Sequence, residues 1–101
     1  TATNNSAEWA GCRATKGASA SGKYYFESRI IDARNGICRV GWSTLSDSLN
    51  LGSSATSMCK LGGYGVGYGF GGTGKKANKN KFEDYGEIFG KGDVIGCCLD
   101  L

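Results

Sequence analysis

The chain has 101 residues, of which 40% are hydrophobic and 21% charged, and its formal net charge is +3. This length allows a single domain, the composition excludes a disordered chain, and the net charge is too small by itself to indicate a nucleic-acid partner. No apolar run approaches the roughly 20 residues of a membrane-spanning helix, and the polar start TATNNSAEWA has no signal-peptide core. We therefore expect a soluble intracellular domain without a membrane partner.

Histidine is absent, and the five cysteines, at positions 12, 38, 59, 97 and 98, include no Cys-x-x-Cys pair. Zinc sites need closely spaced Cys or His ligands, so we expect no metal and no other cofactor. The odd number of cysteines favours free thiols in a reducing compartment. Without histidine the usual general base for a Ser or Cys nucleophile is missing, so catalysis by a triad would need an unusual substitute. We expect no small-molecule substrate.

The first clear structural signal is a pair of apolar-rich runs in the segment KYYFESRIIDARNGICRVGWST. The dipeptide Asn35-Gly36 separates the two runs, and it favours the positive φ angles of a two-residue hairpin turn. We therefore predict that residues 23–33 and 37–44 pair with each other as antiparallel strands.

Trp42 shares one face of the second run with Val40, and it is therefore predicted to lie in the core. The polar stretch after it, residues 46–60, is predicted to be a surface loop with at most a short helical turn. No segment shows the periodicity of an amphipathic helix. With 18 glycines, no proline and short runs of β-branched and aromatic residues, the chain is predicted to be all-β.

Two further strands are predicted in the second half of the chain. Residues 61–71, LGGYGVGYGFG, place bulky side chains on one face and glycine on the other, so that another backbone can approach the bare face closely. Residues 92–101, GDVIGCCLDL, predict a buried strand with four side chains along one side: Ile95, Cys97, Leu99 and Leu101. Because the sequence stops directly after this apolar strand, we expect the domain to be truncated, with its C-terminal strands missing.

Residues 68–76, YGFGGTGKK, contain partial nucleotide-binding patterns. The spacing from Gly69 to Lys75 fits the phosphate loop G-x-x-x-x-G-K-[ST], but Lys76 stands where a hydroxyl would bind magnesium. The residues that follow are a poor start for the helix that such a loop requires. A match to G-x-G-x-x-G within the same stretch is weak, because a glycine repeat produces it by itself. We predict a glycine strand that runs into a tight turn, and no nucleotide cofactor.

Four lysines follow the glycines within seven residues: Lys75, Lys76, Lys79 and Lys81. No acid lies among them, and this composition suits contact with the phosphates of RNA. However, Glu83, Asp84 and Glu87 follow closely enough to neutralise much of the positive field, which favours a solvated loop. The sequence leaves both alternatives open.

These motifs, taken in order, resemble one family. The succession GKYYFES, CRVGWST, YGFGGTGKK, FEDYGE and GDVIGCCLDL resembles the SPRY domain, a β-sandwich interaction module. The opening EWAGCRATKG and the GTGKK turn are most similar to the SPRY domain inserted into the helicase core of DEAD-box RNA helicases of the DEAD-box 1 type. The SPRY domain of the heterogeneous nuclear ribonucleoprotein U type is the second choice. The resemblance covers nearly all of residues 8–101.

The resemblance implies an antiparallel two-layer β-sandwich of the concanavalin-like jelly-roll type, as one SPRY domain over residues 1–101 with only its N-terminal and central strands. It implies that residues 71–76 form a turn and residues 93–101 a central strand. It also implies no catalytic residues, so that ATP hydrolysis and RNA unwinding would belong to the rest of a longer protein. Residues 53–63 look longer than the usual link before the glycine strand, and they receive no role.

The resemblance further implies that loops of the domain bind a protein partner, in the nucleus and the cytoplasm. RNA, held by the basic turn, is the alternative ligand. Aromatic and Arg side chains are favoured interface anchors, and the predicted binding residues combine them with the lysines. The predicted binding residues are Arg13, Lys16, Lys75, Lys76, Lys79, Lys81 and Tyr85.

Overall fold

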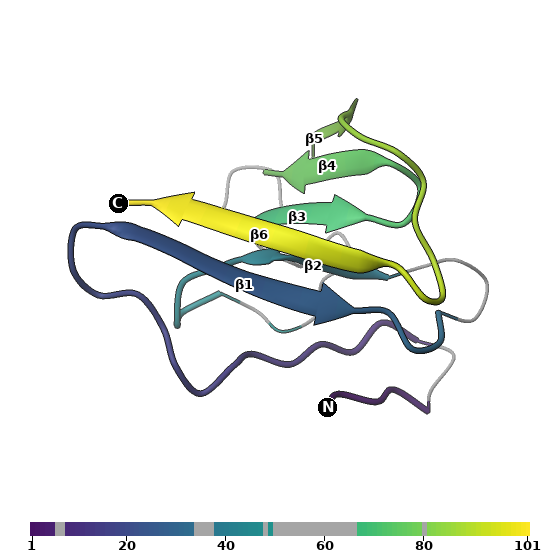
Figure 1. Cartoon of the computed structure of the whole chain (residues 1–101), viewed down its shortest axis with the longest axis horizontal. Helices are drawn as coiled ribbons and strands as arrows, with labels where there is room; N and C mark the ends of the chain where they lie inside the picture. The colour runs from purple at the N-terminus through teal and green to yellow at the C-terminus, as the bar shows by residue number, and fades with distance from the viewer. Residues whose placement is uncertain (6–7, 34–37, 48, 50–66, 80) are drawn as a thin grey trace.

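A computed structural model describes residues 1–5, 8–33, 38–47, 49, 67–79 and 81–101 of the chain. These residues form strands and no helix, in agreement with the all-β prediction, and they therefore contain no helix able to span a membrane. The strands are β1 (Lys23–Arg29), β2 (Arg39–Trp42), β3 (Tyr68–Gly71), β4 (Lys75–Asn78), β5 (Lys81–Asp84) and β6 (Val94–Asp100). They build two antiparallel sheets, one of β1 and β6 and one in the order β2-β3-β4-β5 (Figure 1).

The first sheet joins the first and the last strand of the described chain. β1 pairs along its whole length with β6, from Lys23 opposite Asp100 to Arg29 opposite Val94. The predicted pairing of residues 23–33 with 37–44 is therefore wrong, and the turn proposed at Asn35-Gly36 lies outside the described residues.

The physical reason is that a turn signal indicates a chain reversal but does not select the partner strand. β1 and β6 both have seven residues and the same alternation, so their inward side chains fall opposite each other. Phe26 lies opposite Cys97, and Tyr24 lies opposite Leu99. β2 has only four residues, and it pairs instead with the glycine strand β3.

Glycine permits the close pairing of β2 with β3. Gly41 lies opposite Gly69, and a Cβ atom on Gly41 would run into the carbonyl oxygen of Tyr68. Gly69 itself is buried. The predicted glycine strand with a bare face is thus confirmed for residues 68–71, whereas residues 61–66 lie outside the described part.

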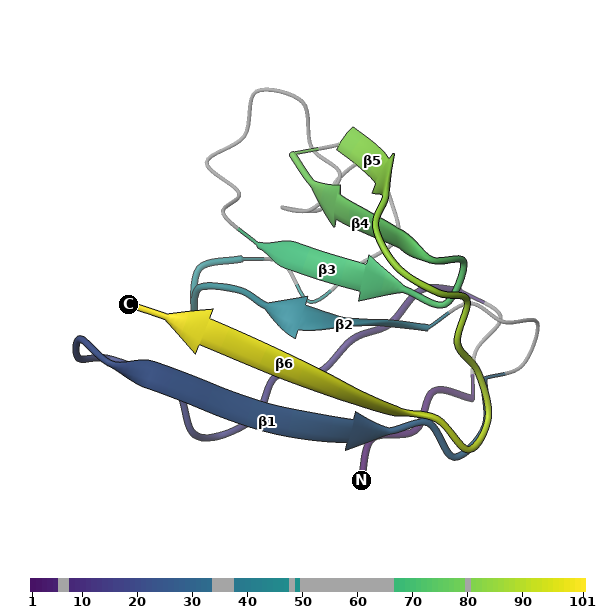
Figure 2. The ribbon, with the colours of Figure 1, turned by 45° about the horizontal axis from the view of Figure 1, so that its top comes forward.

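The two sheets pack against each other, as the ribbon in Figure 2 shows, and this confirms the predicted antiparallel β-sandwich. Trp42 of β2 meets Phe26 of β1 edge-on, with ring centroids 5.0 Å apart, in agreement with its predicted core position. The buried apolar side chains among the described residues are Ile30, Ala77, Phe89 and Cys97. A small core of this kind leaves a modest margin of stability.

β6 is covered on one face only. Cys97 is buried and its neighbours Ile95 and Leu99 are half-buried, as the predicted inward alternation requires. Leu101 lies beyond the strand and is 54% exposed, so its predicted place in that row is wrong. The opposite face, which includes Cys98, is exposed, and β6 is therefore not the fully buried strand that its apolar sequence suggested.

The N-terminal segment lies against the outer face of the larger sheet. The guanidinium carbon of Arg39 in β2 lies 4.8 Å from the ring centroid of Trp9 and 5.3 Å from that of Phe82 in β5. Arg39 also shares this face with Gly71, its register partner. An Arg between two aromatic rings gains both cation–π attraction and apolar contact, so the N-terminal segment is an integral part of the fold.

Candidate interaction surface

The turn between β3 and β4 uses its backbone groups within the protein. The amide of Gly72 donates to the carbonyl oxygen of Cys38 (2.9 Å), and that of Gly74 donates to Gly71 (2.9 Å). Gly74 has φ +86°, and a Cβ there would lie 2.6 Å from the carbonyl oxygen of Gly86. Only glycine fits this conformation and this close approach without strain.

The carbonyl groups of the same turn hold the segment that leads to β6. Gly74 accepts hydrogen bonds from the amides of Tyr85 and Gly86, both 3.0 Å long, and Gly72 accepts one from Phe89 (3.1 Å). The amides of Gly72 and Gly74 are thus engaged, and the next residue, Lys75, starts a strand and not a helix. The prediction of a glycine strand that runs into a tight turn is confirmed, and the turn lacks the helix N-terminus of a phosphate loop.

A groove of about 390 Å³ lies beside this segment. We call it the Tyr85 groove, and its lining residues are Phe70, Tyr85, Gly86, Glu87, Ile88, Phe89, Asp93, Val94 and Ile95. In Figure 1 the chain between β5 and β6 runs past the ends of the strands of the larger sheet to reach the start of β6. Residues of both sheets therefore line the groove, Phe70 from β3 and Val94 and Ile95 from β6.

Aromatic rings stabilise one side of the Tyr85 groove. The ring of Phe70 packs against Phe89, with centroids 4.9 Å apart, and meets Tyr85 edge-on at 5.3 Å. Phe89 is buried, so these contacts fix the segment from the inside. The ring contacts and the backbone hydrogen bonds together make this wall of the groove preorganised.

The outer rim combines exposed apolar side chains with acids. Tyr85 is 66% exposed, Ile88 80% and Val94 48%. Glu87 and Asp93 are the charged residues of the lining, and Asp93 Oδ2 accepts a hydrogen bond from the amide of Gly90 (2.8 Å). Tyr85 was predicted as a binding residue, whereas Ile88, Glu87 and Val94 were not. Glu87 and Ile88 lie within residues 85–93, which form no helix or strand, so no sequence periodicity could have found them. Val94 lies on the exposed face of β6, opposite the predicted inward row.

The predicted basic turn is an antiparallel hairpin. Lys75 and Lys76 belong to β4 and Lys81 opens β5, so the expectation that a loop or turn carries them is wrong for these three residues. Lys79 does lie in the turn, with φ +49°. The three lysines lie on strands because β4 pairs with β3 on one side and with β5 on the other, so that the hairpin continues the larger sheet.

Three of the four lysines face carboxylates. Lys75 Nζ lies 2.8 Å from Asp84 Oδ1. Lys81 Nζ lies 3.2 Å from Glu83 Oε1, and Lys76 Nζ lies 3.4 Å from Glu83 Oε2. The hydrogen bonds from Lys81 and then Lys76 hold the pKa of Glu83 below its usual value, and Lys75 does the same to the pKa of Asp84. Lys79 makes no ion pair with any residue that the structure describes.

The other two predicted residues differ from each other. Arg13 donates to the backbone carbonyl of Asp47 (2.8 Å) and lies 3.4 Å from Ser43 Oγ, so it orders the loop after β2. Lys16 is exposed, with no hydrogen bond or ion pair to the described residues. Lys76 and Tyr85 do come together, because Lys76 Nζ lies 5.7 Å from the Tyr85 ring centroid.

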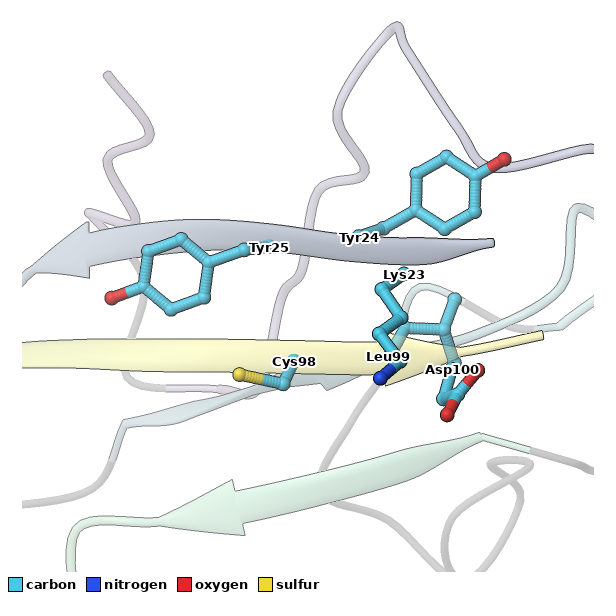
Figure 3. A pocket seen from close by; sticks show the side chains of 6 residues that line it. All are labelled: Lys23, Tyr24, Tyr25, Cys98, Leu99 and Asp100. Carbon is cyan, nitrogen blue, oxygen red and sulfur yellow. The ribbon is translucent and has the colours of Figure 1, made fainter. Parts of the chain in front are cut away.

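A second hollow, of about 490 Å³, lies on the β1–β6 sheet. Figure 3 shows its lining residues: Lys23, Tyr24, Tyr25, Cys98, Leu99 and Asp100. Tyr25 Oη donates to Glu27 Oε1 (2.9 Å), and this bond raises the pKa of Tyr25. These residues are neighbours across two paired strands, with one base and one acid among them, and they do not form a set suited to acid–base catalysis.

Four cysteines lie in the described residues, and all are free thiols: Cys12, Cys38, Cys97 and Cys98. Burial raises the pKa of Cys97 and of Cys38. Within the described part of the chain, no three Cys, Asp or Glu side chains are grouped so that they could hold a metal ion.

The β-sandwich and the order of its motifs define a family of β-sandwich domains. The SPRY domain family matches residues 23–101, and the chain belongs to this family. It is 55% identical over 94 residues to the ATP-dependent RNA helicase Ddx1 of Drosophila melanogaster and 50% identical over 94 residues to the ATP-dependent RNA helicase DDX1 of Xenopus laevis. Each alignment covers 93% of this chain and 11% of the helicase.

The chain is also similar to a ribonucleoprotein. It is 36% identical over 97 residues to the heterogeneous nuclear ribonucleoprotein U-like protein 2 of Mus musculus, in an alignment covering 88% of this chain and 12% of that protein. No solved structure matches the chain significantly. The chain thus spans about a tenth of the length of the curated relatives that it matches.

Proposed function

We propose that the chain is a non-catalytic interaction module of a DEAD-box RNA helicase and that it binds a protein partner. The similarity to a segment of two ATP-dependent RNA helicases supports this assignment. Because the chain corresponds to 11% of those proteins, ATP hydrolysis and RNA unwinding would belong to the rest of a longer protein. A module of a ribonucleoprotein of the U type is the alternative assignment, at the lower identity of 36%.

The Tyr85 groove is the observation that carries the protein-binding proposal. Tyr85, Ile88 and Val94 expose adjoining apolar surface over a fixed aromatic wall. Large exposed apolar patches on folded proteins mark interaction sites, and rigid aromatic anchors contribute most to interface energies. We also propose a nuclear and cytoplasmic location, which the free thiols support because thiols persist in reducing compartments.

Site-specific photo-crosslinking in nuclease-treated cell extracts tests this function. A photoreactive phenylalanine analogue replaces Ile88 at the groove and, in a matched control, Tyr25, which is comparably exposed on the β1–β6 sheet. We expect discrete protein adducts from position 88 and few from position 25. Equal adducts from both positions, or none from position 88, would contradict the proposal.

RNA contact by the β4–β5 hairpin is a second candidate function. Four lysines stand against two carboxylates there, and Lys79 has no ion pair among the described residues. Fluorescence anisotropy with single-stranded RNA at two salt concentrations tests it. If the hairpin binds phosphates, Lys79→Glu weakens binding and the affinity falls steeply with salt, whereas the matched variant Lys91→Glu, at an exposed lysine outside the hairpin, leaves binding unchanged. Equal effects of the two variants would exclude the hairpin.

A further inference from the structure

Charge separates the Tyr85 groove from the rest of this basic chain. The net charge of the sequence is +3, yet the charged residues that line the groove are both acids, Glu87 and Asp93. Lys76, which reaches the rim of the groove, lies 3.4 Å from Glu83 and 5.7 Å from the ring centroid of Tyr85, and Arg29 lies opposite Val94 on β1 but does not line the groove. Glu87 has no ion pair with any described residue, so its charge is available to a ligand.

The size of the Tyr85 groove limits what can enter it. A volume of about 390 Å³ is near the lower end of ligand sites, which span about 300–1,000 Å³. This space accepts one or two large side chains and not a folded domain. The half-buried ring of Phe70 and the exposed ring of Tyr85 offer aromatic surface to an apolar side chain, while Ile88 and Val94 flank the opening.

We infer that the Tyr85 groove binds a short protein segment in which a large apolar side chain stands next to a Lys or Arg. The apolar side chain packs on Phe70 and Tyr85, and the neighbouring cation meets Glu87 and Asp93. This inference rests on the proposed protein-binding function and adds the chemistry of the partner. RNA and acidic or phosphorylated peptides fit poorly, because Glu87 and Asp93 repel their negative charge.

Binding of four matched peptides to the full 101-residue chain tests the inference. The fluorescein-labelled peptides share one ten-residue Gly/Ser frame and carry at its centre Phe-Lys, Phe-Glu, Ser-Lys or Ser-Glu. We expect the Phe-Lys peptide to bind tightest, and the loss of either its ring or its cation to weaken binding about three- to tenfold. Amide chemical shifts of residues 85–95, compared with those of residues 23–29, locate the site.

Two carboxylate variants distinguish the groove from general electrostatics. Glu87→Lys is expected to reverse the preference from the Phe-Lys to the Phe-Glu peptide. Asp100→Lys changes the net charge equally but lies at the opposite end of β6, outside the groove, and it should leave the preference unchanged. Asp93 is not substituted, because its carboxylate also accepts a hydrogen bond from the amide of Gly90 (2.8 Å).

The failure of this inference differs from the failure of the proposed function. Equal binding of the Phe-Lys and Phe-Glu peptides, equal effects of Glu87→Lys and Asp100→Lys, or no binding of any peptide at millimolar concentration would overturn the inference. Protein adducts from position 88 would still support protein binding in each of these cases. The absence of such adducts would reject the proposed function itself.

Discussion

The glycines of residues 71–74 and the lysines of residues 75–81 are neighbours in the sequence, but they hold the structure together in different ways. The glycine turn is bound through its backbone. Gly72 and Gly74 each donate one hydrogen bond and accept at least one, and their partners reach from Cys38 to Phe89. The lysines are bound through side chains, to carboxylates on the adjacent strand.

This difference shows that the glycine turn, and not the lysine hairpin, supports the fold. Backbone hydrogen bonds inside a packed turn cannot be replaced by water without opening the fold, so a change there is costly. Exposed ion pairs exchange readily with water and salt, and most contribute little. The stretch YGFGGTGKK therefore contains a structural junction followed by a surface that can change its partners.

Gly74→Ala is expected to have the largest effect on stability. The new Cβ must accept φ +86° and would lie 2.6 Å from the carbonyl oxygen of Gly86. We expect a loss of about 3 kcal/mol in the free energy of unfolding, measured by urea denaturation with Trp fluorescence. Gly92→Ala is the matched control, because Gly92 has φ +91° but open space around it, and it should lose only about 1 kcal/mol. Equal losses from Gly74→Ala and Gly92→Ala would show that the close approach to Gly86 does not contribute to the destabilisation.

Phe89→Leu tests whether side chains secure the same segment that the glycine turn holds by its backbone. Phe89 is buried against Phe70, and the substitution keeps most of the volume but loses the ring contact. We expect a loss of about 1 kcal/mol by the same denaturation. The neighbouring variant Ile88→Ala, at an exposed position, should change stability by less than about 0.5 kcal/mol. A larger loss from Ile88→Ala would mean that the rim supports the fold.

A double-mutant cycle on Lys75 and Asp84 examines the lysine half. Both side chains are exposed, although their charged atoms lie 2.8 Å apart. We expect the single variants Lys75→Ala and Asp84→Ala and the double variant to unfold at nearly the same urea concentration as the parent. A coupling as large as the effect of Gly74→Ala would contradict the contrast between the two halves.

The smallest expected effect is a change in titration. The hydrogen bond from Lys75 holds the pKa of Asp84 below its ordinary value of 3.8, and Lys81 with Lys76 hold that of Glu83 below 4.5. Because both folded pKa values are lowered, the ion pairs contribute fully above the ordinary values and are lost as the pH falls through the folded ones. Carboxyl carbon NMR should show that Lys75→Ala raises the pKa of Asp84 and leaves that of Glu83 unchanged. A shift of both would indicate one shared network.

Local patterns predicted several elements correctly. The alternation of glycine with bulky residues identified β3, and the apolar alternation in GDVIGCCLDL identified β6 and the inward position of Cys97. The same reasoning failed for the partner of β1, because the pairing of strands far apart in the sequence depends on non-local packing. It also missed the pairing that makes Lys75 and Lys76 part of a strand.

The candidate site was predicted only in part. Tyr85 was predicted as a binding residue because aromatic side chains are favoured interface anchors, whereas Ile88 and Val94 were not predicted. They come together because the glycine turn pulls residues 85–89 against the larger sheet, while β1 fixes the start of β6. A groove of this kind depends on contacts between separate elements, and local sequence patterns do not encode such contacts.

By itself, the sequence determined the all-β class, the order of the family motifs and the glycine strand that runs into a tight turn. These properties are local, since they depend on side-chain alternation and on the backbone freedom of single residues. The tertiary structure alone decided that β1 pairs with β6, that three lysines face carboxylates, and that an acidic apolar groove lies beside Tyr85. Each of these arises where segments distant in the chain meet, and burial and charge there depend on both partners at once.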